Sequence, residues 1–220
     1  MKLASRHDCM HAYQGCVFAA QNVGKSENHV KVVSWDTLVD NGFSGTAAFA
    51  TVEAHISEGI KRITWPEGND AFVIYPEKDG NGVKPIKAAF IAHLISRGWI
   101  PEVRRFDAHY SYESGFPLPF VVEWETGNIS SSHRAINRMA MGMLETSISG
   151  GVLIVPSRAL YKYLTDRVGN AQELVPYHPL WRLWSQHAEF NYLAIVTIEH
   201  DGESLNVPRI AKGTDGRALI

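Results

Sequence analysis

Three acidic residues have a spacing that could form a metal-binding site. Asp107 precedes the run FVVEWET, in which Glu123 and Glu125 stand two positions apart. Alternate side chains of an extended strand point to one face, so both glutamates should lie on the same face, roughly 7 Å apart. Carboxylates this close repel one another and resist transfer out of water, so a positive group should offset them, either a basic side chain or a divalent cation. Oxygen ligands suit Mg²⁺, and this pattern is typical of sites that cleave phosphodiesters.

Two other interpretations of these carboxylates stay open at this stage. Two glutamates on a solvated strand face are common, and in that interpretation they have no catalytic or binding role. The separation also lies between those of retaining and inverting glycosidases. A sugar site would need aromatic side chains near the acids, whereas Trp124 should point to the opposite face of the strand.

The charge of the chain is balanced overall but not locally. The net charge of -2 excludes a histone-like protein that coats nucleic acid. Residues 98–125 contain two basic and five acidic residues, whereas residues 126–170 contain five basic and two acidic residues. An acidic pocket beside a basic surface is what a metal-dependent enzyme acting on a polyanion requires, although counts this small also arise by chance.

The segment directly after the second glutamate could read DNA bases. A Gly-Asn turn leads into a predicted helix and places Asn128, Ser130 and Arg134 near its N-terminal end. Helix N-termini attract phosphate, and Asn and Arg side chains match purine edges in the major groove. Simple capping by Ser130 with a solvated Arg134 explains the same residues.

Asp166 and Arg167 form a second candidate for base recognition. Arg can donate to guanine while Asp accepts from the amino group of cytosine, so the two could read one G·C pair. A surface ion pair worth about 0–1 kcal/mol is the alternative.

The elements that must position these residues alternate between strand-like and helix-like patterns. We predict helices over 46–60, 85–97, 130–144 and 157–168, and strands over 71–75, 119–126, 151–155 and 192–198. The N-cap of the third helix could be Ser130 or Ser131. This alternation indicates an α/β fold with a central mixed β-sheet flanked by helices on both faces. We expect residues 1–50 to be an N-terminal extension packed on or next to the core, and residues 51–220 to form a single domain.

The composition is that of a soluble globular protein, with 45% hydrophobic and 20% charged residues. No run approaches the roughly 18 apolar residues of a membrane span. Cys9 and Cys16 are the only cysteines, which excludes a disulfide framework and a cysteine-rich zinc site and suits a reducing cytoplasm. The polar N-terminal residues do not resemble a signal peptide.

Longer blocks of the sequence are much more specific than any of these motifs. VEWETGNISSSHRAINRMAMG and LIVPSRALYKYLTDRVGNAQELVPY, preceded by TWPEG and DGNGVKPIK and followed by NVPRIAKGTDG, closely resemble the BamHI-like type II restriction endonucleases. The resemblance extends from about Trp65 to Gly216, whereas the first 50 or so residues have no clear counterpart. Within the wider PD-(D/E)xK nucleases this family is a variant with Glu, here Glu125, where Lys is usual.

This resemblance implies a restriction-endonuclease-like fold and a role for each candidate residue. Asp107, Glu123 and Glu125 match the catalytic acids, and Asp107, Glu123 and Glu102 match positions in or near the metal site. The positions that match DNA-contacting residues are Asn128, Ser130, Arg134, Asp166 and Arg167 for the bases, and Lys87 near the DNA backbone.

The implied protein is a Mg²⁺-dependent endonuclease that acts as a homodimer on double-stranded DNA in the cytoplasm. The expected target is a palindromic six-base site of the GGATCC type, cut to leave 5′-phosphate and 3′-hydroxyl ends. Mn²⁺ should substitute for Mg²⁺, and Ca²⁺ should support binding without efficient cleavage. A cognate DNA methyltransferase could act in the same system. The alternatives are a catalytically silent DNA-binding protein on the same scaffold and a nuclease of relaxed specificity.

Overall fold

The structure, a computed structural model, describes residues 31–103, 105–165, 168–184 and 192–212. Asp166 and Arg167, two of the predicted base-reading residues, lie outside the described residues. No helix within the described part of the chain is long and apolar enough to cross a membrane.

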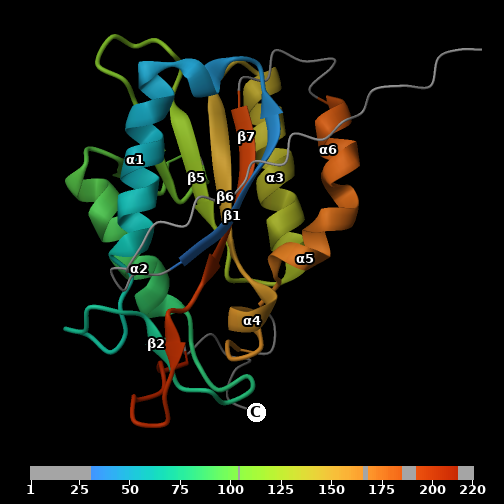
Figure 1. Cartoon of the computed structure of the whole chain (residues 1–220). Helices are drawn as coiled ribbons and strands as arrows, with labels where there is room; N and C mark the ends of the chain where they lie inside the picture. The colour runs from blue at the N-terminus through green and yellow to red at the C-terminus, as the bar shows by residue number, and fades with distance from the viewer. Residues whose placement is uncertain (1–30, 104, 166–167, 185–191, 213–220) are drawn as a thin grey trace, which may run out of the picture.

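The main sheet has a parallel centre and antiparallel edges. Its strands, in spatial order, are β1 (Lys31–Asp40), β7 (Tyr192–Glu199), β6 (Gly150–Pro156), β5 (Phe120–Trp124), β4 (Ala108–Tyr110) and β3 (Ile100–Pro101). β5, β6 and β7 are parallel to one another, while β1 and β4 run antiparallel to their neighbours β7 and β5. A separate parallel pair, β2 (Val73–Ile74) and β8 (Gly202–Glu203), lies below the main sheet in Figure 1.

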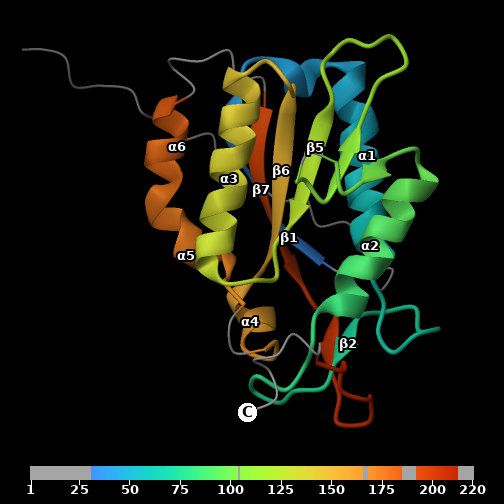
Figure 2. The same ribbon diagram turned by 180° about the vertical axis from the view of Figure 1, so that it is seen from behind.

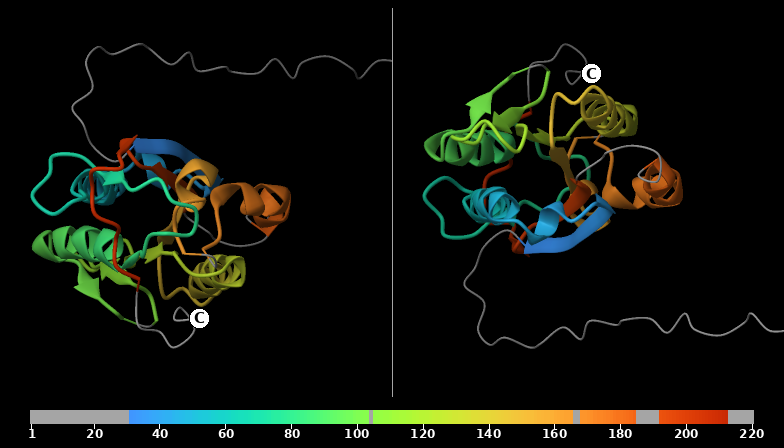
Figure 3. Two further views of the ribbon diagram at one scale, coloured as in Figure 1. Left: turned by 90° about the horizontal axis from the view of Figure 1, so that it is seen from below. Right: turned by 90° about the horizontal axis from the view of Figure 1, so that it is seen from above.

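Helices cover both faces of the main sheet. They are α1 (Ala47–Lys61), α2 (Lys84–Ser96), α3 (Ile129–Leu144), α4 (Arg158–Tyr161), α5 (Ala171–Leu174) and α6 (His178–Trp184), with short 3₁₀ turns η1 (Phe43–Gly45) and η2 (Val175–Tyr177). Figures 1 and 2 show α1 and α2 on one face and α3 and α6 on the other, and the end-on views of Figure 3 show the sheet between them. The predicted mixed sheet with helices on both faces is confirmed.

The two faces of the sheet belong to two separate apolar cores. On the α1/α2 side, Val122 and Trp124 of β5 join a large cluster with Ile56 and Phe90. On the α3 side, Val121 packs with residues that α3 presents at helical spacing, among them Ile136 and Met139. Alternate residues of β5 therefore face opposite cores, as the sequence pattern predicts.

Residues 31–40, which belong to the expected N-terminal extension, contribute a strand to the sheet itself. β1 pairs with β7 along its whole length, and the boundary expected at residue 50 falls inside α1. The sequence pattern does not reveal β1, because two register shifts interrupt its pairing and its buried residues are only Leu38 and Val39. An edge strand with one partner needs little apolar sequence.

The helix predicted over residues 157–168 is only one turn long. α4 ends at Tyr161, since backbone groups beyond it bond elsewhere: Asp79 N–H donates to Lys162 O at 3.0 Å, and Asn81 N–H donates to Tyr163 O at 2.9 Å. The fully buried Asn81 side chain adds a bond from Nδ2 to Tyr163 O at 3.0 Å. A long-range contact, invisible to local helix propensity, overrides it here.

Candidate active site

β5 and β4 bring the three predicted catalytic acids together. Ala108 pairs with Val122, so Asp107 lies level with Glu123, the next residue of β5. Asp107 Oδ2 accepts a hydrogen bond from Trp124 N–H at 2.7 Å, which anchors this carboxylate to the strand that carries both glutamates. Glu125 follows the strand at its C-terminal end, and its N–H donates to Ile154 O on β6 at 2.9 Å.

The environment of Glu123 disfavours its charged form. Its side chain is buried, with only 6% of the residue exposed. Burial, followed by repulsion from Asp107, raises the pKa of Glu123 to about 7, and the attraction of Arg138 only partly opposes this. Burial also raises the pKa of Glu125, with repulsion from Asp107 acting in the same direction and the Gly127 N–H opposing it. Carboxylates with raised pKa values in one cluster are typical of functional sites.

Two cationic side chains approach the acids from opposite faces of the sheet. Lys87 on α2 places Nζ 2.5 Å from Asp107 Oδ1. Arg138 on α3 pairs with Glu123, and its Nη1 also donates to Arg105 O at 2.5 Å. The cluster therefore contains three acids and two basic groups.

Arg138 is the site residue that the sequence analysis did not single out. It follows Arg134 by four residues, so both lie on one side of α3. That spacing, with the local excess of basic residues, is the only sequence signal for it.

Glu125 is held by the backbone of the turn that follows it. Gly127 N–H donates to Glu125 Oε1 at 2.6 Å. A Cβ atom at position 127 would lie only 2.6 Å from the same oxygen. Gly127 therefore permits this contact, and an alanine there would push the carboxylate away.

The donor set fits Mg²⁺ in its chemistry, because the three acids offer only oxygen ligands in a buried, electrostatically unfavourable cluster. Among the residues that the structure describes, no three His, Cys, Asp or Glu side chains already form a group that could hold a metal ion. In the structure, Lys87 engages Asp107, Arg138 engages Glu123 and Gly127 engages Glu125. Metal binding would require these carboxylate oxygens to exchange partners.

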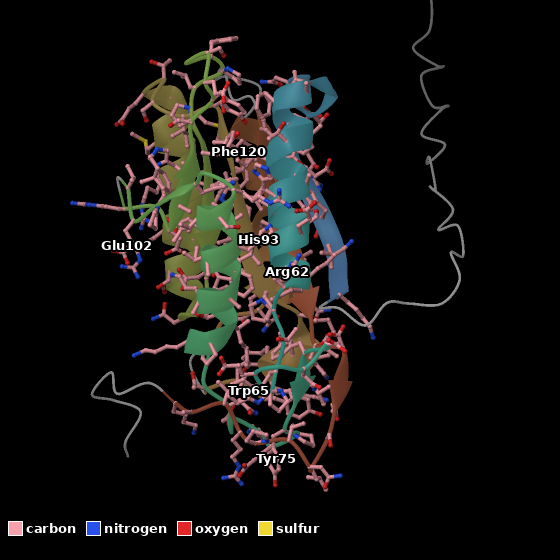
Figure 4. The ribbon with its side chains drawn as sticks, turned by 90° about the vertical axis from the view of Figure 1, so that its left-hand side faces the viewer. Arg62, Trp65, Tyr75, His93, Glu102 and Phe120 are labelled. Atoms are coloured by element: carbon pink, nitrogen blue, oxygen red, sulfur yellow. The ribbon has the colours of Figure 1, made fainter. Side chains whose placement is uncertain are left out.

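Glu102 contacts this cluster only through its backbone, among the contacts of the described residues. It lies on the turn between β3 and β4, where its side chain is exposed and its N–H donates to Asp107 O at 3.0 Å. Figure 4 shows it at the outer edge of the molecule, away from His93 and Arg62. Lys87, predicted to lie near the DNA backbone, contacts Asp107 through its ammonium group.

The described base-reading candidates cluster at the start of α3, next to the acids. Asn128 rather than Ser130 or Ser131 is the N-cap, and its side chain accepts from Ser131 N–H at 3.2 Å. Asn128, Ser130 and Arg134 are all exposed, and Arg134 donates to Ser131 Oγ at 2.7 Å.

The turn before α3 also contacts the segment that follows the second predicted recognition pair. Gly169 N–H donates to Gly127 O at 2.8 Å. Gly127 therefore links Glu125 to Gly169 through two hydrogen bonds.

Comparison with known proteins identifies the family. The family model described as "Restriction endonuclease BamHI" matches residues 30–217. The chain belongs to the BamHI restriction endonuclease family. It is therefore a type II site-specific deoxyribonuclease, and the resemblance seen in the sequence is confirmed. The match starts at residue 30 and includes β1, so the expectation that the first 50 or so residues have no counterpart in the family is wrong for residues 30–50.

Curated relatives agree with this assignment. The chain is 48% identical over 203 residues to the type II restriction enzyme OkrAI of Oceanobacter kriegii, covering 86% of this chain and 100% of that protein. It is 32% identical over 167 residues to the type II restriction enzyme BamHI of Bacillus amyloliquefaciens, covering 69% and 75% of the two chains. Among solved structures, free BglII matches with a TM-score of 0.43 and 10% identity over 74% of this chain and 78% of that chain.

Proposed function

We propose that this protein is a Mg²⁺-dependent homodimeric endonuclease that cuts double-stranded DNA at a palindromic six-base site of the GGATCC type. The observation that carries the proposal is the cluster of Asp107, Glu123 and Glu125 beside an exposed helix N-terminus that bears Asn128, Ser130 and Arg134. Membership of the family supplies the activity, and this arrangement supplies candidate residues for cleavage and recognition.

Asp107 and Glu123 are the proposed metal ligands, with Glu102 as a further candidate on the neighbouring turn. Bound Mg²⁺ would supply polarisation of the scissile phosphate and a lower pKa for the attacking water. Glu125 then accepts a proton from that water or serves as a further ligand. Its raised pKa makes it a better proton acceptor than a carboxylate with the ordinary value. The expected products carry 5′-phosphate and 3′-hydroxyl ends.

Recognition is assigned to the exposed polar groups at the start of α3 together with Asp166 and Arg167. Arg134 and Arg167 have the donors to bind guanine edges, and Asn128 can bind a purine edge. Lys87 is close enough to Asp107 to contact the phosphate next to the scissile bond.

A second copy of the chain is the proposed partner, because one carboxylate cluster cuts one strand and a palindrome has two equivalent halves. The helices on the α3 face expose large apolar side chains, namely Met141, Leu144, Val175, Tyr177, Leu180 and Leu183. α3 and α6 lie side by side (Figures 1 and 2), joined by ring contacts of His133 with Tyr177 and Trp181. This apolar helix face is the proposed dimer interface.

Digestion of plasmid DNA, followed by sequencing of the ends, tests the function most directly. The proposal predicts cuts at one palindrome with Mg²⁺ or Mn²⁺, and binding without efficient cleavage with Ca²⁺. A smear of fragments would indicate relaxed specificity, and binding without cuts would indicate the silent DNA-binding alternative. Glu123→Ala should keep Ca²⁺-supported binding and lose nicking; an active variant would remove Glu123 from the metal site.

Recognition is tested by Arg167→Ala. Loss of a bidentate contact to guanine should weaken specific binding by about 1–3 kcal/mol per half-site at one G·C pair. Binding to random DNA should change little. An equal loss on all sequences would make Arg167 a phosphate contact instead.

The dimer is tested by light scattering after size-exclusion chromatography. Leu144→Asp and Leu183→Asp place charges on the proposed interface and should give monomers. Leu205→Asp is the matched control, since Leu205 is 72% exposed beyond β8 and away from the α3 face. Equal behaviour of all three variants would contradict this interface. We expect the dimer to work in the cytoplasm, beside a methyltransferase that protects the host's own sites.

A further inference from the structure

Arg138 makes contacts that tie together three elements around the carboxylate cluster. From α3 it pairs with Glu123 on β5, and it donates to Arg105 O at 2.5 Å in the turn before β4. Its guanidinium carbon also lies 5.9 Å from the centre of the Phe106 ring. One side chain thus contacts Glu123 and the two residues that directly precede Asp107.

The backbone that Arg138 contacts adopts an unusual conformation. Arg105 has φ 71° and Glu102 has φ 53°, both in the left-handed region that non-glycine residues seldom adopt. A turn of this kind persists only when its surroundings hold it in place. The bond from Arg138 to Arg105 O is such a restraint, placed two residues before Asp107.

The pairing with Glu123 has a second consequence. Arg138 uses Glu123 Oε1, an oxygen that a proposed metal ligand would offer to a cation. A guanidinium and a divalent cation bound to the same carboxylate repel each other, and the repulsion is strong where water is excluded. Arg138 and the metal therefore compete for Glu123.

We propose that Arg138 is a positioning residue of the metal site: it is the internal counter-ion of Glu123 in the metal-free protein, and it must release Glu123 when a divalent cation binds. This inference rests on the proposed function, because it takes Glu123 as a metal ligand. It adds a residue that neither the sequence motifs nor the family resemblance assigned to the site.

Two substitutions separate the charge of Arg138 from its size. Arg138→Gln removes the positive charge but keeps an amide that can donate to Arg105 O. Arg138→Lys keeps the charge beside Glu123 while losing the planar guanidinium that contacts two acceptors. Arg97→Ala is the matched control, since Arg97 forms an ion pair of 2.6 Å with Glu58 on the exposed outer side of α1 and α2.

The measurement is Mn²⁺ affinity of the DNA-free protein, followed by the electron paramagnetic resonance of free Mn²⁺ during titration. Arg138→Gln should bind Mn²⁺ more tightly by about tenfold or more, because the competing cation is gone. Arg138→Lys and Arg97→Ala should stay within about threefold of the parent protein. With chelator present, Arg138→Gln should also melt at a lower temperature, since the buried Glu123 then lacks its cation.

The outcomes distinguish this inference from the proposed function. Unchanged or weaker Mn²⁺ binding by a folded Arg138→Gln protein would overturn the role of Arg138 while leaving the endonuclease proposal intact. Equal tightening in Arg138→Lys would also overturn it, because the charge would then be irrelevant. Absence of Mn²⁺ binding in the parent protein and in every variant, together with no cleavage of plasmid DNA, would overturn both.

Discussion

Glu123, which is buried, and Glu199, which is half-buried, are acids on two parallel strands of the same sheet, but they are stabilised in different ways. Glu199, at the end of β7, accepts a hydrogen bond from the Ser157 hydroxyl and contacts the His200 ring. Burial alone would raise the pKa of Glu199, but these partners outweigh it and lower that pKa. Glu123, in β5, has Asp107 as a close neighbour, and its pKa is raised despite the pairing with Arg138.

Burial disfavours the charged form of both acids, so their partners decide the direction in which each pKa moves. Glu199 has local donors that satisfy its charge, so it stabilises the fold without any external cation. Glu123 shares its surroundings with two other carboxylates, and their combined charge exceeds what Lys87 and Arg138 provide. An acid left under-compensated in this way favours the binding of a further cation, which is why the cluster on β4 and β5, rather than the one around Glu199, is the candidate active site.

The largest effect should come from removing the charge of Glu123. The pKa of Glu123 is 4.5 in its ordinary state and about 7 in the folded protein. Between pH 4.5 and pH 7, Glu123 is therefore protonated in the folded state but ionised in the unfolded state. Its contribution to stability is fully present below pH 4.5 and is lost as pH rises through 7. This loss is up to about 3 kcal/mol. Glu123→Gln should abolish it, so urea unfolding with chelator at pH 5 and pH 8 should show a smaller decline than in the parent protein.

The matched substitution Glu199→Gln should leave the pH dependence of stability unchanged over this range. The pKa of Glu199 is lowered in the folded protein, so its contribution is present above its ordinary pKa and is lost only when the pH falls through the lower folded value. Between pH 5 and pH 8 the Glu199→Gln protein should therefore follow the slope of the parent. Equal slopes for all three proteins would erase the contrast between the two acids.

A smaller effect is expected from Gly127→Ala, which tests whether the Gly127 N–H positions the Glu125 carboxylate. Glu125 Oε1 depends on the Gly127 N–H, and the new methyl group would lie 2.6 Å from that oxygen. Displacement of the carboxylate by about 1 Å should slow cleavage on the order of 10²-fold. Sequence-specific binding with Ca²⁺ should persist, since the Asn128 cap of α3 is untouched. Loss of specific binding in a gel-shift assay would instead show that the substitution disturbs the recognition turn.

Much of this contrast could be predicted from the sequence because it depends on local pattern. The alternation of side chains along the strand places Glu123 and Glu125 on the face opposite to that of Trp124. The long sequence blocks around them identify the family. Apolar runs predict β6 and β7, because a parallel strand that is buried on both faces needs apolar side chains at almost every position. The helix from Thr46, whose side chain caps α1, also follows from local chemistry.

The remaining features depend on contacts between distant segments. β1 forms because β7 offers it a partner, and α4 stops early because the loop at Asn81 takes the carbonyl of Tyr163. Arg138 belongs to the site only because α3 crosses the turn at Arg105. These contacts join residues that are far apart in the sequence, so local propensity and motifs could not predict them.

The smallest expected effect is that of Ser157→Ala, which removes one partner of Glu199 without altering the carboxylates of β5. Ser157 Oγ accepts from Ala159 N–H at 3.1 Å and Leu160 N–H at 3.0 Å, so it also caps α4. Loss of the cap and of the bond to Glu199 should lower the free energy of unfolding by about 1–2 kcal/mol, measured with urea. Cleavage and Mn²⁺ affinity should be unchanged, because Glu199 keeps its contact with His200. A fall in cleavage without a fall in stability would mean that Glu199 and its partners take part in the reaction. The partners of an acid would then no longer distinguish a structural role from a catalytic one.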